Sequence, residues 1–397
     1  MLSLSMIVRD EAAQIEDCLR SVQGFADELV VVDTGSTDDT VARAQAMGAR
    51  VEQIPWPGDF APARNQALQW VQGDWVLVLD ADERLRPEAW APLRALMAQP
   101  DVLLINLLRH ERGAVQSPYS NVSRLFRRHP AIRWSRAYHS MVDDSVAELL
   151  QREPHWRIAD CPEPALIHDG YRPELLAQGN KAERLRAAME AELQQRPGDP
   201  YACAKLGSLE VAQGQLARGL ALLQQGLEHC PAEAHPERYE LLLHLAMAQA
   251  PSDPTAAVAL YRQALQLPLA PRLSLAARLN LAALLLELGQ PQEAEELCRR
   301  ATAVAPEIGL GWYNLGLIRR KQGDLAGALE AYREARRVNP EHAETHQNLA
   351  VASLLGGDIE GARSGFRQAI ALLGQQGRQA EALQLRQQAG ELVKLEA

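Results

Sequence analysis

Three carboxylates stand together directly after a short apolar run. Val76 to Leu79 are apolar without a break, and Asp80, Asp82 and Glu83 follow. Such a run predicts a strand buried on both faces. In open α/β sheets the ligand site lies beyond the carboxyl ends of the strands. Divalent cations such as Mg²⁺ take few protein oxygens and complete their shell with water and substrate phosphates. The pattern therefore predicts a metal–diphosphate site, and the alternative is an acidic turn with solvated carboxylates.

A second apolar run also ends in an acid. Leu29 to Val32 precede Asp33 and the polar loop Thr34 to Asp38. The carboxyl ends of parallel strands share one edge of a sheet, so Asp33 is expected on the same edge as Asp80. A carboxylate can accept hydrogen bonds from a ribose or a base. The glycine-rich motifs of dinucleotide-binding and P-loop proteins are absent, which disfavours both classes.

Strands and helices must alternate to place these acids. Apolar runs predict five strands, at 2–8, 29–33, 50–54, 76–79 and 102–108. Helical patterns lie between them, ending near Gly24, Gly48 and Val71. This alternation predicts an α/β fold with a parallel sheet and right-handed crossovers.

Four motifs follow one another along this part of the chain: Ser5 to Glu11, Val30 to Thr40, Ala63-Arg64-Asn65 and Asp80 to Glu83. Together they resemble the family 2 glycosyltransferases of the GT-A (Rossmann-like) fold. The resemblance is close over residues 1–110 and weakens towards 172. It implies a nucleotide-sugar donor, which we take to be a UDP-sugar, a Mn²⁺ or Mg²⁺ ion, and inversion at the anomeric carbon.

The resemblance also implies roles for individual residues. Asp33 would contact the nucleotide, Arg64 would support the nucleotide or its diphosphate, and Asp80 and Asp82 would address ribose, metal and diphosphate. The residues implied in nucleotide-sugar binding are Val8, Asp10, Glu11, Asp33, Gly35, Ser36, Asp38, Arg64, Asp80 and Ala81.

Two histidines follow in the chain. Enzymes that resemble this chain and carry helical-repeat tails have His-x-Gly-Tyr where His168 to Tyr171 stand, so His168 is expected to join Asp80 and Asp82 as a metal or diphosphate ligand. At Tyr138-His139-Ser140 a serine replaces the glutamate that the resemblance leads us to expect. The general base therefore stays open. The catalytic candidates are Asp82, Glu83, Asp143, Asp144 and His139.

The segment from Arg109 to Arg136 carries seven arginines and one acid, Glu111. Because arginine pairs well with phosphate and carboxylate, this segment predicts a positive patch that faces the donor diphosphate or the acceptor. The alternative is a solvated strand face.

The second half of the chain repeats with a period of 34 residues. Leu315-Gly316, Ala328, Tyr332 and Ala335 recur 34 positions earlier and later as equivalent residues: Leu281-Ala282, Ala294, Cys298 and Ala301, then Leu349-Ala350, Ala362, Phe366 and Ala369. This period is the tetratricopeptide signature and predicts an all-α solenoid. We expect a glycosyltransferase domain at 1–172, a connecting helix at 173–198, about five repeats at 199–376 and a capping helix at 377–397.

Bulk properties exclude several classes. A net charge of −10 argues against a general nucleic-acid or anionic-membrane binder. The five cysteines are scattered, which suits a reducing compartment. No apolar stretch reaches the roughly 20 residues of a membrane helix. The sequence predicts a cytoplasmic protein without a membrane span.

The sequence as a whole predicts a metal-dependent glycosyltransferase that resembles hexosyltransferases. The acceptor would be a protein or peptide held by the repeats, or a glycan. The repeats could instead bind a partner, mediate self-association or act as a passive spacer. The alternative function is a tetratricopeptide scaffold whose glycosyltransferase domain binds nucleotide but is catalytically degenerate, an interpretation that Ser140 favours.

Overall fold

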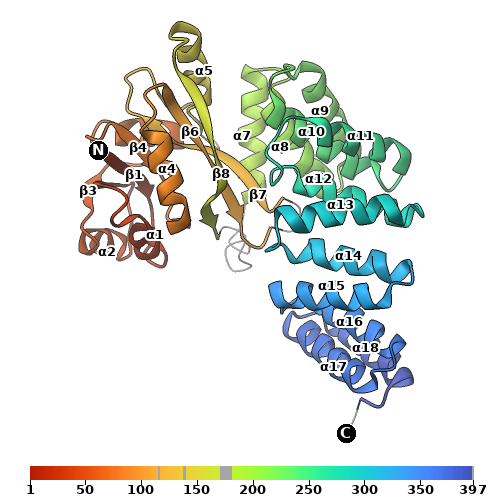
Figure 1. Ribbon diagram of the computed structural model, residues 1–397. Coiled ribbons are helices and arrows are strands. Elements are labelled where there is room, and N and C mark those ends of the chain that lie inside the picture. Colours follow the sequence, from red (N-terminus) through yellow and green to blue (C-terminus); the bar gives the residue numbers. More distant parts are fainter. Residues whose placement is uncertain (115–116, 137–139, 170–180, 396–397) are drawn as a thin grey trace. The chain divides into compact units, whose positions relative to one another are not determined.

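The computed structural model describes residues 1–397 except 115–116, 137–139, 170–180 and 396–397. The chain forms two compact units, Met1–His229 and Cys230–Ala397. The first unit contains the sheet and three helices that follow it, and the second consists of helices (Figure 1). The domain limits expected from the sequence stay predictions.

The first four strands form the parallel half of an eight-stranded sheet. They are β1 (Leu2–Val8), β2 (Glu28–Asp33), β3 (Arg50–Gln53) and β4 (Trp75–Val78), in the order β3-β2-β1-β4. The helices between them are α1 (Ile15–Val22), α2 (Thr40–Ala46) and α3 (Phe60–Ala67). The predicted alternation is confirmed here. The strand order reverses at β1, and such a switch point is where open α/β sheets bind ligands.

The other half of the sheet corrects the prediction of a wholly parallel one. Its strands are β5 (Glu83–Leu85), β6 (Val102–Glu111), β7 (Tyr119–Arg127) and β8 (Arg157–His168), in the order β4-β7-β6-β8-β5. Strand β7 runs antiparallel to both β4 and β6. The connection from β6 to β7 is too short for a crossover, and short connections join antiparallel strands. As a result β7, rather than β6, lies beside β4.

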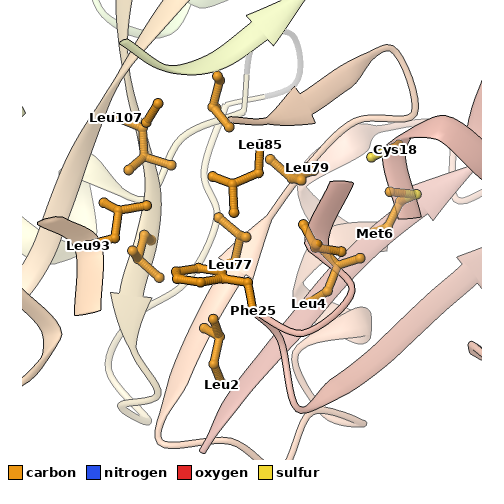
Figure 2. Close-up of a cluster of buried hydrophobic side chains, with 14 of the residues drawn as sticks. Leu2, Leu4, Met6, Cys18, Phe25, Leu77, Leu79, Leu85, Leu93 and Leu107 are labelled. Atoms are coloured by element: carbon orange, nitrogen blue, oxygen red, sulfur yellow. The ribbon is translucent and has the colours of Figure 1, made fainter. Parts of the chain in front are cut away.

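Helices cover the two faces of the sheet. Alongside α1 to α3, the first unit has a 3-10 turn (Pro87–Ala89), α4 (Trp90–Met97) and α5 (Asp143–Arg152). Strand β4 is buried on both faces, as expected: Leu77 packs with Leu4 and Phe25 in one cluster, and Val76 and Val78 belong to the cluster on the other face. Figure 2 shows the first of these clusters, with Leu4, Phe25 and Leu77 gathered between sheet and helices. This rigid core fixes the strand ends that carry the acids.

Helices account for the rest of the described chain. The first unit ends with α7 (Lys181–Gln195), α8 (Pro200–Ala212) and α9 (Leu216–His229). The helices of the second unit are α10 (His235–Gln249), α11 (Pro254–Gln266), α12 (Leu275–Glu287), α13 (Pro291–Val304), α14 (Gly309–Lys321), α15 (Leu325–Val338), α16 (Ala343–Leu355), α17 (Ile359–Gln375) and α18 (Gln379–Leu392). No helix of the described residues has the length and apolarity needed to cross a membrane.

The small and large positions of the 34-residue period pack as the repeat predicts. Ala282 and Ala350 are buried, and their counterpart Gly316 faces Tyr332, which is fully buried. A Cβ atom added at Gly316 would lie 2.4 Å from Cε1 of Tyr332. Because protein interiors are packed as densely as organic crystals, this contact leaves no room for a methyl group.

We expect Gly316→Ala to destabilise the second unit by about 1–3 kcal/mol, because overpacking exceeds the gain of about 1 kcal/mol in helix propensity. The matched control is Gly390→Ala in α18, where no described atom lies within 4 Å of an added Cβ. That variant should stabilise by about 0.5–1 kcal/mol. Thermal unfolding followed by circular dichroism measures both, and equal stability of the two variants would contradict the packing argument.

Candidate active site

The loops after β1 and β2 interlock. Asp10 has a left-handed φ of 55°, a conformation that aspartate tolerates better than most residues. Its carboxylate accepts hydrogen bonds from the backbone nitrogen and hydroxyl of Thr37, at 2.7 and 3.1 Å. Its own N–H donates to Oγ of Ser36 at 2.9 Å, and the N–H of Glu11 donates to Oγ1 of Thr40 at 2.7 Å. The two loops therefore form one rigid ledge at the switch point.

Asp33 fixes the loop that follows β2 through hydrogen bonds to its backbone. It is 2% exposed, and its carboxylate accepts hydrogen bonds from the backbone N–H groups of Gly35 and Ser36 at 3.1–3.2 Å. Gly35 has a φ of 107°, which favours glycine. Asp38 accepts a hydrogen bond from the N–H of Ala12 at 3.1 Å.

The structure thus gathers most of the predicted nucleotide-sugar residues at one sheet edge. They are Val8, Asp10, Glu11, Asp33, Gly35, Ser36 and Asp38. Their individual roles stay predictions.

Asp80 follows β4 and lies between two buried arginines. Its Oδ1 accepts a hydrogen bond from Nη2 of Arg64 at 2.7 Å, and its Oδ2 accepts one from Nη2 of Arg124 at 2.9 Å. Burial alone would raise the pKa of Asp80, but Arg124 and Arg64 lower it far below its usual range. Burial lowers the pKa of Arg64 to about 10, with Asp80 opposing this shift and Arg124 adding to it. Both carboxylate oxygens are therefore committed to guanidinium groups.

Trp134 completes this arginine pair. Its ring centre lies 4.6 Å from Cζ of Arg64 and 5.9 Å from Cζ of Arg124. Asn65 exchanges two hydrogen bonds with the backbone of Trp134, at 2.9 and 2.7 Å. A guanidinium against an indole face gains cation–π attraction. The side chain of Arg64 thus contacts the ring of Trp134, and the side chain of Asn65 binds its backbone.

Glu83 is fully buried below the acidic turn. It accepts a hydrogen bond from the N–H of Asp80 at 2.9 Å and another from Nη1 of Arg109 at 2.6 Å. Arg109 also donates to Glu111 at 2.8 Å. Because both Glu83 oxygens have partners inside the protein, its position suits the support of the turn better than the deprotonation of an acceptor.

His168 lies between two carboxylates. Its Nδ1 is 2.5 Å from Oε2 of Glu111, and its Nε2 is 3.1 Å from Oδ2 of Asp82. Burial opposes the charged form, but hydrogen bonds to Asp82 and Glu111 raise the pKa of His168 to about 9. Burial would raise the pKa of Glu111, whereas His168 and Arg109 lower it to about 2. The structure therefore brings together Asp82 and His168, two of the three residues that the sequence predicted as metal ligands, and that role stays a prediction.

The predicted metal set of Asp80, Asp82 and His168 is not assembled as one site. Among the described residues, no group of three or more histidine, cysteine, aspartate or glutamate side chains is arranged to hold a metal ion. Asp82 and His168 offer one carboxylate and one imidazole in contact with each other; the carboxylate suits Mn²⁺ or Mg²⁺, whereas an imidazole is more typical of other transition metals. Asp80 does not fit as a ligand, because its oxygens bind arginines.

The remaining described candidates for the general base have partners of their own. Asp143 accepts a hydrogen bond from Ser123 at 2.7 Å. Asp144 forms ion pairs with Arg136 and Arg196. Burial would raise the pKa of Asp144, but hydrogen bonding to Ser135 and the charge of Arg136 lower it overall. His139 lies outside the described residues.

The arginines of the segment 109–136 have separate partners, and their predicted role towards the donor diphosphate or the acceptor stays a prediction. Arg109, Arg124 and Arg136 are largely buried and paired with acids from other parts of the chain. Arg133 pairs with Glu148 at the surface. The side chains have separate partners because they lie on different faces and loops.

Sequence reasoning gave no specific role to Arg109, Glu111, Arg124 or Trp134. One signal was available: Arg109 and Glu111 are two residues apart in a strand, so they share a face.

Asp169 is a further buried acid, paired with Arg84 and Arg112, and its N–H donates to the carbonyl of Asp82 at 3.1 Å.

The chain matches known families in both halves. Residues 3–158 match the model of glycosyl transferase family 2, and residues 248–308 and 313–376 match models of tetratricopeptide repeats. In its helical part the chain resembles the solved structure of YrrB, a TPR protein, with 18% identity over 51% of this chain and 99% of that chain and a TM-score of 0.39.

For two of three relatives described next, the match covers most of the relative's own length. A TPR repeat-containing protein of Synechococcus elongatus is 45% identical over 309 residues, which is 77% of this chain and 76% of the relative. An uncharacterised glycosyltransferase of Rickettsia bellii is 33% identical over 48% of this chain and 72% of the relative. The glycosyltransferase SunS of Bacillus phage SPbeta is 24% identical over 50% of this chain and 46% of the relative. The chain therefore belongs to the family 2 glycosyltransferases, in a form that carries C-terminal tetratricopeptide repeats.

Proposed function

We propose that this glycosyltransferase moves a sugar from a UDP-sugar to a protein, peptide or glycan acceptor with the help of a divalent metal ion. The observation that carries the proposal is the assembly at one sheet edge of the ledge around Asp10 and Asp33, the arginine pair on Asp80 and the Asp82–His168 pair. A nucleotide on the ledge would direct its diphosphate towards the turn after β4. This arrangement suits group transfer from a nucleoside diphosphate.

Asp82 and His168 would hold Mn²⁺ or Mg²⁺. A bound ion would act as a Lewis acid on the oxygens of the departing diphosphate. Glu111 contacts the other ring nitrogen of His168, and a carboxylate in that position fixes the orientation of a ligating imidazole. To ligate through Nε2, His168 must release the proton that its two carboxylates favour.

Arg64 and Arg124 would stabilise the negative charge of the leaving group. Asp80 fixes both guanidinium groups, so their charge is oriented before the donor arrives. Preorganised charge of this kind contributes more to rate than charge that must reorganise during the reaction.

The acceptor nucleophile would attack the anomeric carbon from the face opposite the diphosphate, with inversion. The base that removes its proton stays open. His139 and Asp143 remain candidates from the sequence, and the internal partners of Glu83 and Asp144 make those two less suitable. The repeats would bind a protein or peptide acceptor, and a cytoplasmic location stays a prediction from the sequence.

The second candidate function is a nucleotide-binding scaffold without transferase activity. Ser140, at the position where similar enzymes are expected to have a glutamate, favours it. Binding of UDP without turnover of UDP-sugars by the wild-type protein would support the scaffold and contradict the transferase.

We expect Asp82→Asn to lower the rate of UDP release from a UDP-sugar by at least about 100-fold, because the metal loses a charged ligand. It should also weaken the dependence of UDP affinity on Mn²⁺. Calorimetric titration with UDP, with and without Mn²⁺, and a UDP-release assay measure the two effects. The matched control is Asp160→Asn, an acid on β8 that accepts a hydrogen bond from Asn106, and it should retain activity. Full activity of Asp82→Asn would contradict the metal assignment.

The charge of His168 predicts how stability depends on pH in the metal-free protein. Its pKa is about 9 when folded and about 6.5 when unfolded. The raised pKa means that the stabilisation is complete below pH 6.5 and is lost as pH rises through 9. Between pH 7 and 10 the loss should reach at most about 3 kcal/mol.

Urea unfolding in the presence of EDTA at several pH values tests this expectation. His168→Gln should lower stability at pH 7 and remove the part of the pH dependence that the wild type shows between about pH 6.5 and 9. Other groups that titrate in this range contribute equally to both proteins, so the difference between the two curves isolates His168. Parallel curves for the two proteins would mean that His168 is not held in its charged form.

A further inference from the structure

The orientation of Arg64 depends on Trp134. Arg64 makes one hydrogen-bonded ion pair, from Nη2 to Asp80. Its Nε and Nη1 are buried and have no hydrogen-bond partner among the described residues. The indole face of Trp134, 4.6 Å away, is therefore the other restraint on the guanidinium plane. Whatever holds Trp134 in place also holds this donor-site arginine.

Trp134 is held by helix α3 and by the residues that follow it in the chain. Asn65 bonds its backbone in both directions. The next residue, Ser135, pairs with Met141 through two backbone hydrogen bonds, at 2.9 and 3.1 Å. The hydroxyl of Ser135 also donates to Asp144 at 2.7 Å.

Arg136 follows with a left-handed φ of 69°. This conformation costs an L-residue with a long side chain free energy, and it persists only where the surroundings impose it. Here the conformation is imposed by ion pairs that the Arg136 side chain forms with acidic residues. The Arg136 side chain is 10% exposed and forms a two-bond pair with Asp199, at 3.0 and 3.2 Å. It also lies 3.4 Å from Asp144 and 4.0 Å from Glu192.

Two of the acids that pair with Arg136 come from helices that follow the sheet in the chain. Glu192 is in α7, and Asp199 is the N-cap of α8, where it also accepts the N–H of Ala202 at 2.9 Å. Arg196 joins the same network by pairing with Asp144 and Glu192. Two arginines and three acids thus link the segment around Trp134 to α5, α7 and α8 within the first unit.

We propose that Arg136 is a positioning residue through which α7 and α8 fix the donor site. Asp199 and Glu192 hold Arg136, Arg136 holds the backbone at Trp134, and Trp134 holds the guanidinium plane of Arg64. The helices after the sheet are then part of the catalytic unit rather than a separate attachment. The effect on donor binding rests on the proposed function, whereas the coupling of the helices to Trp134 does not.

Asp199→Asn is the sharpest test. Asparagine caps a helix as well as aspartate does, so α8 keeps its N-cap while Arg136 loses the charged, two-bond partner. The matched control is Asp253→Asn. Asp253 caps α11 through the N–H of Ala256 at 2.9 Å and, like Asp199, precedes a proline. Two variants of Arg136 form a second pair: Arg136→Lys keeps the positive charge, and Arg136→Met removes it.

Hydrogen exchange measured by mass spectrometry reports the coupling without any substrate. In Asp199→Asn, exchange in peptides covering 130–136 should rise by at least about 3-fold, while Asp253→Asn leaves it unchanged. The affinity for UDP with Mn²⁺ should fall roughly 3- to 10-fold in Asp199→Asn and Arg136→Met, and less in Arg136→Lys. Circular dichroism confirms that each variant is folded.

Wild-type exchange over 130–136 in Asp199→Asn would overturn the proposal, as would an equal change in Asp253→Asn. A rise confined to α8 would also overturn it, because only the helix cap would then have been affected. If the wild-type protein binds no nucleotide, the proposed function fails, and the exchange comparison still decides whether the helices hold Trp134.

Discussion

The carboxylate of Asp80 is shared by two arginines from different elements, and the site depends on this interaction. Arg64 comes from α3 and Arg124 from β7. Both guanidinium groups are largely buried, and a buried charge without a partner is strongly unfavourable, so the removal of Asp80 would take the paired acid away from two arginines at once. The pairing therefore locks α3, β4 and β7 together at the point where the chain turns away from the sheet. It also explains why Asp80 suits the orientation of arginines better than the binding of a metal.

From the backbone of Asp80 a line of hydrogen bonds and ion pairs crosses the sheet edge, and its charges alternate in sign from Glu83 onward. Glu83 accepts from the backbone of Asp80 and from Arg109, Arg109 pairs with Glu111, Glu111 contacts His168, and His168 contacts Asp82. Each charge is satisfied by neighbours of opposite sign, and a satisfied buried network is rigid. Asp82 lies at the end of this line and is partly exposed. The network thus supports one carboxylate that remains available for chemistry.

The same principle extends to the helices beyond the sheet. Arg136 and Arg196 use Asp144, Glu192 and Asp199 to tie α5, α7 and α8 to the segment that bears Trp134. In the second unit the packing is different in kind, because small residues such as Gly316 meet large ones such as Tyr332 across helix pairs. Charge pairing builds the site, and apolar packing at a regular spacing builds the repeats.

The sequence by itself determined what local patterns encode. Apolar runs predicted β1, β2 and β4, the acids at the strand ends predicted that Asp33 and the acidic turn share one sheet edge, and the 34-residue period predicted the repeats. Side-chain spacing within one element fixes these features. Only the tertiary structure decided the partners of Asp80, the burial of Arg109 and Arg124, the antiparallel pairing of β7 with β4 and β6, and the pairing of Asp144 with Arg136. These contacts join elements whose neighbours are set by strand order, and the type of a charged residue does not reveal which opposite charge the fold will bring to it.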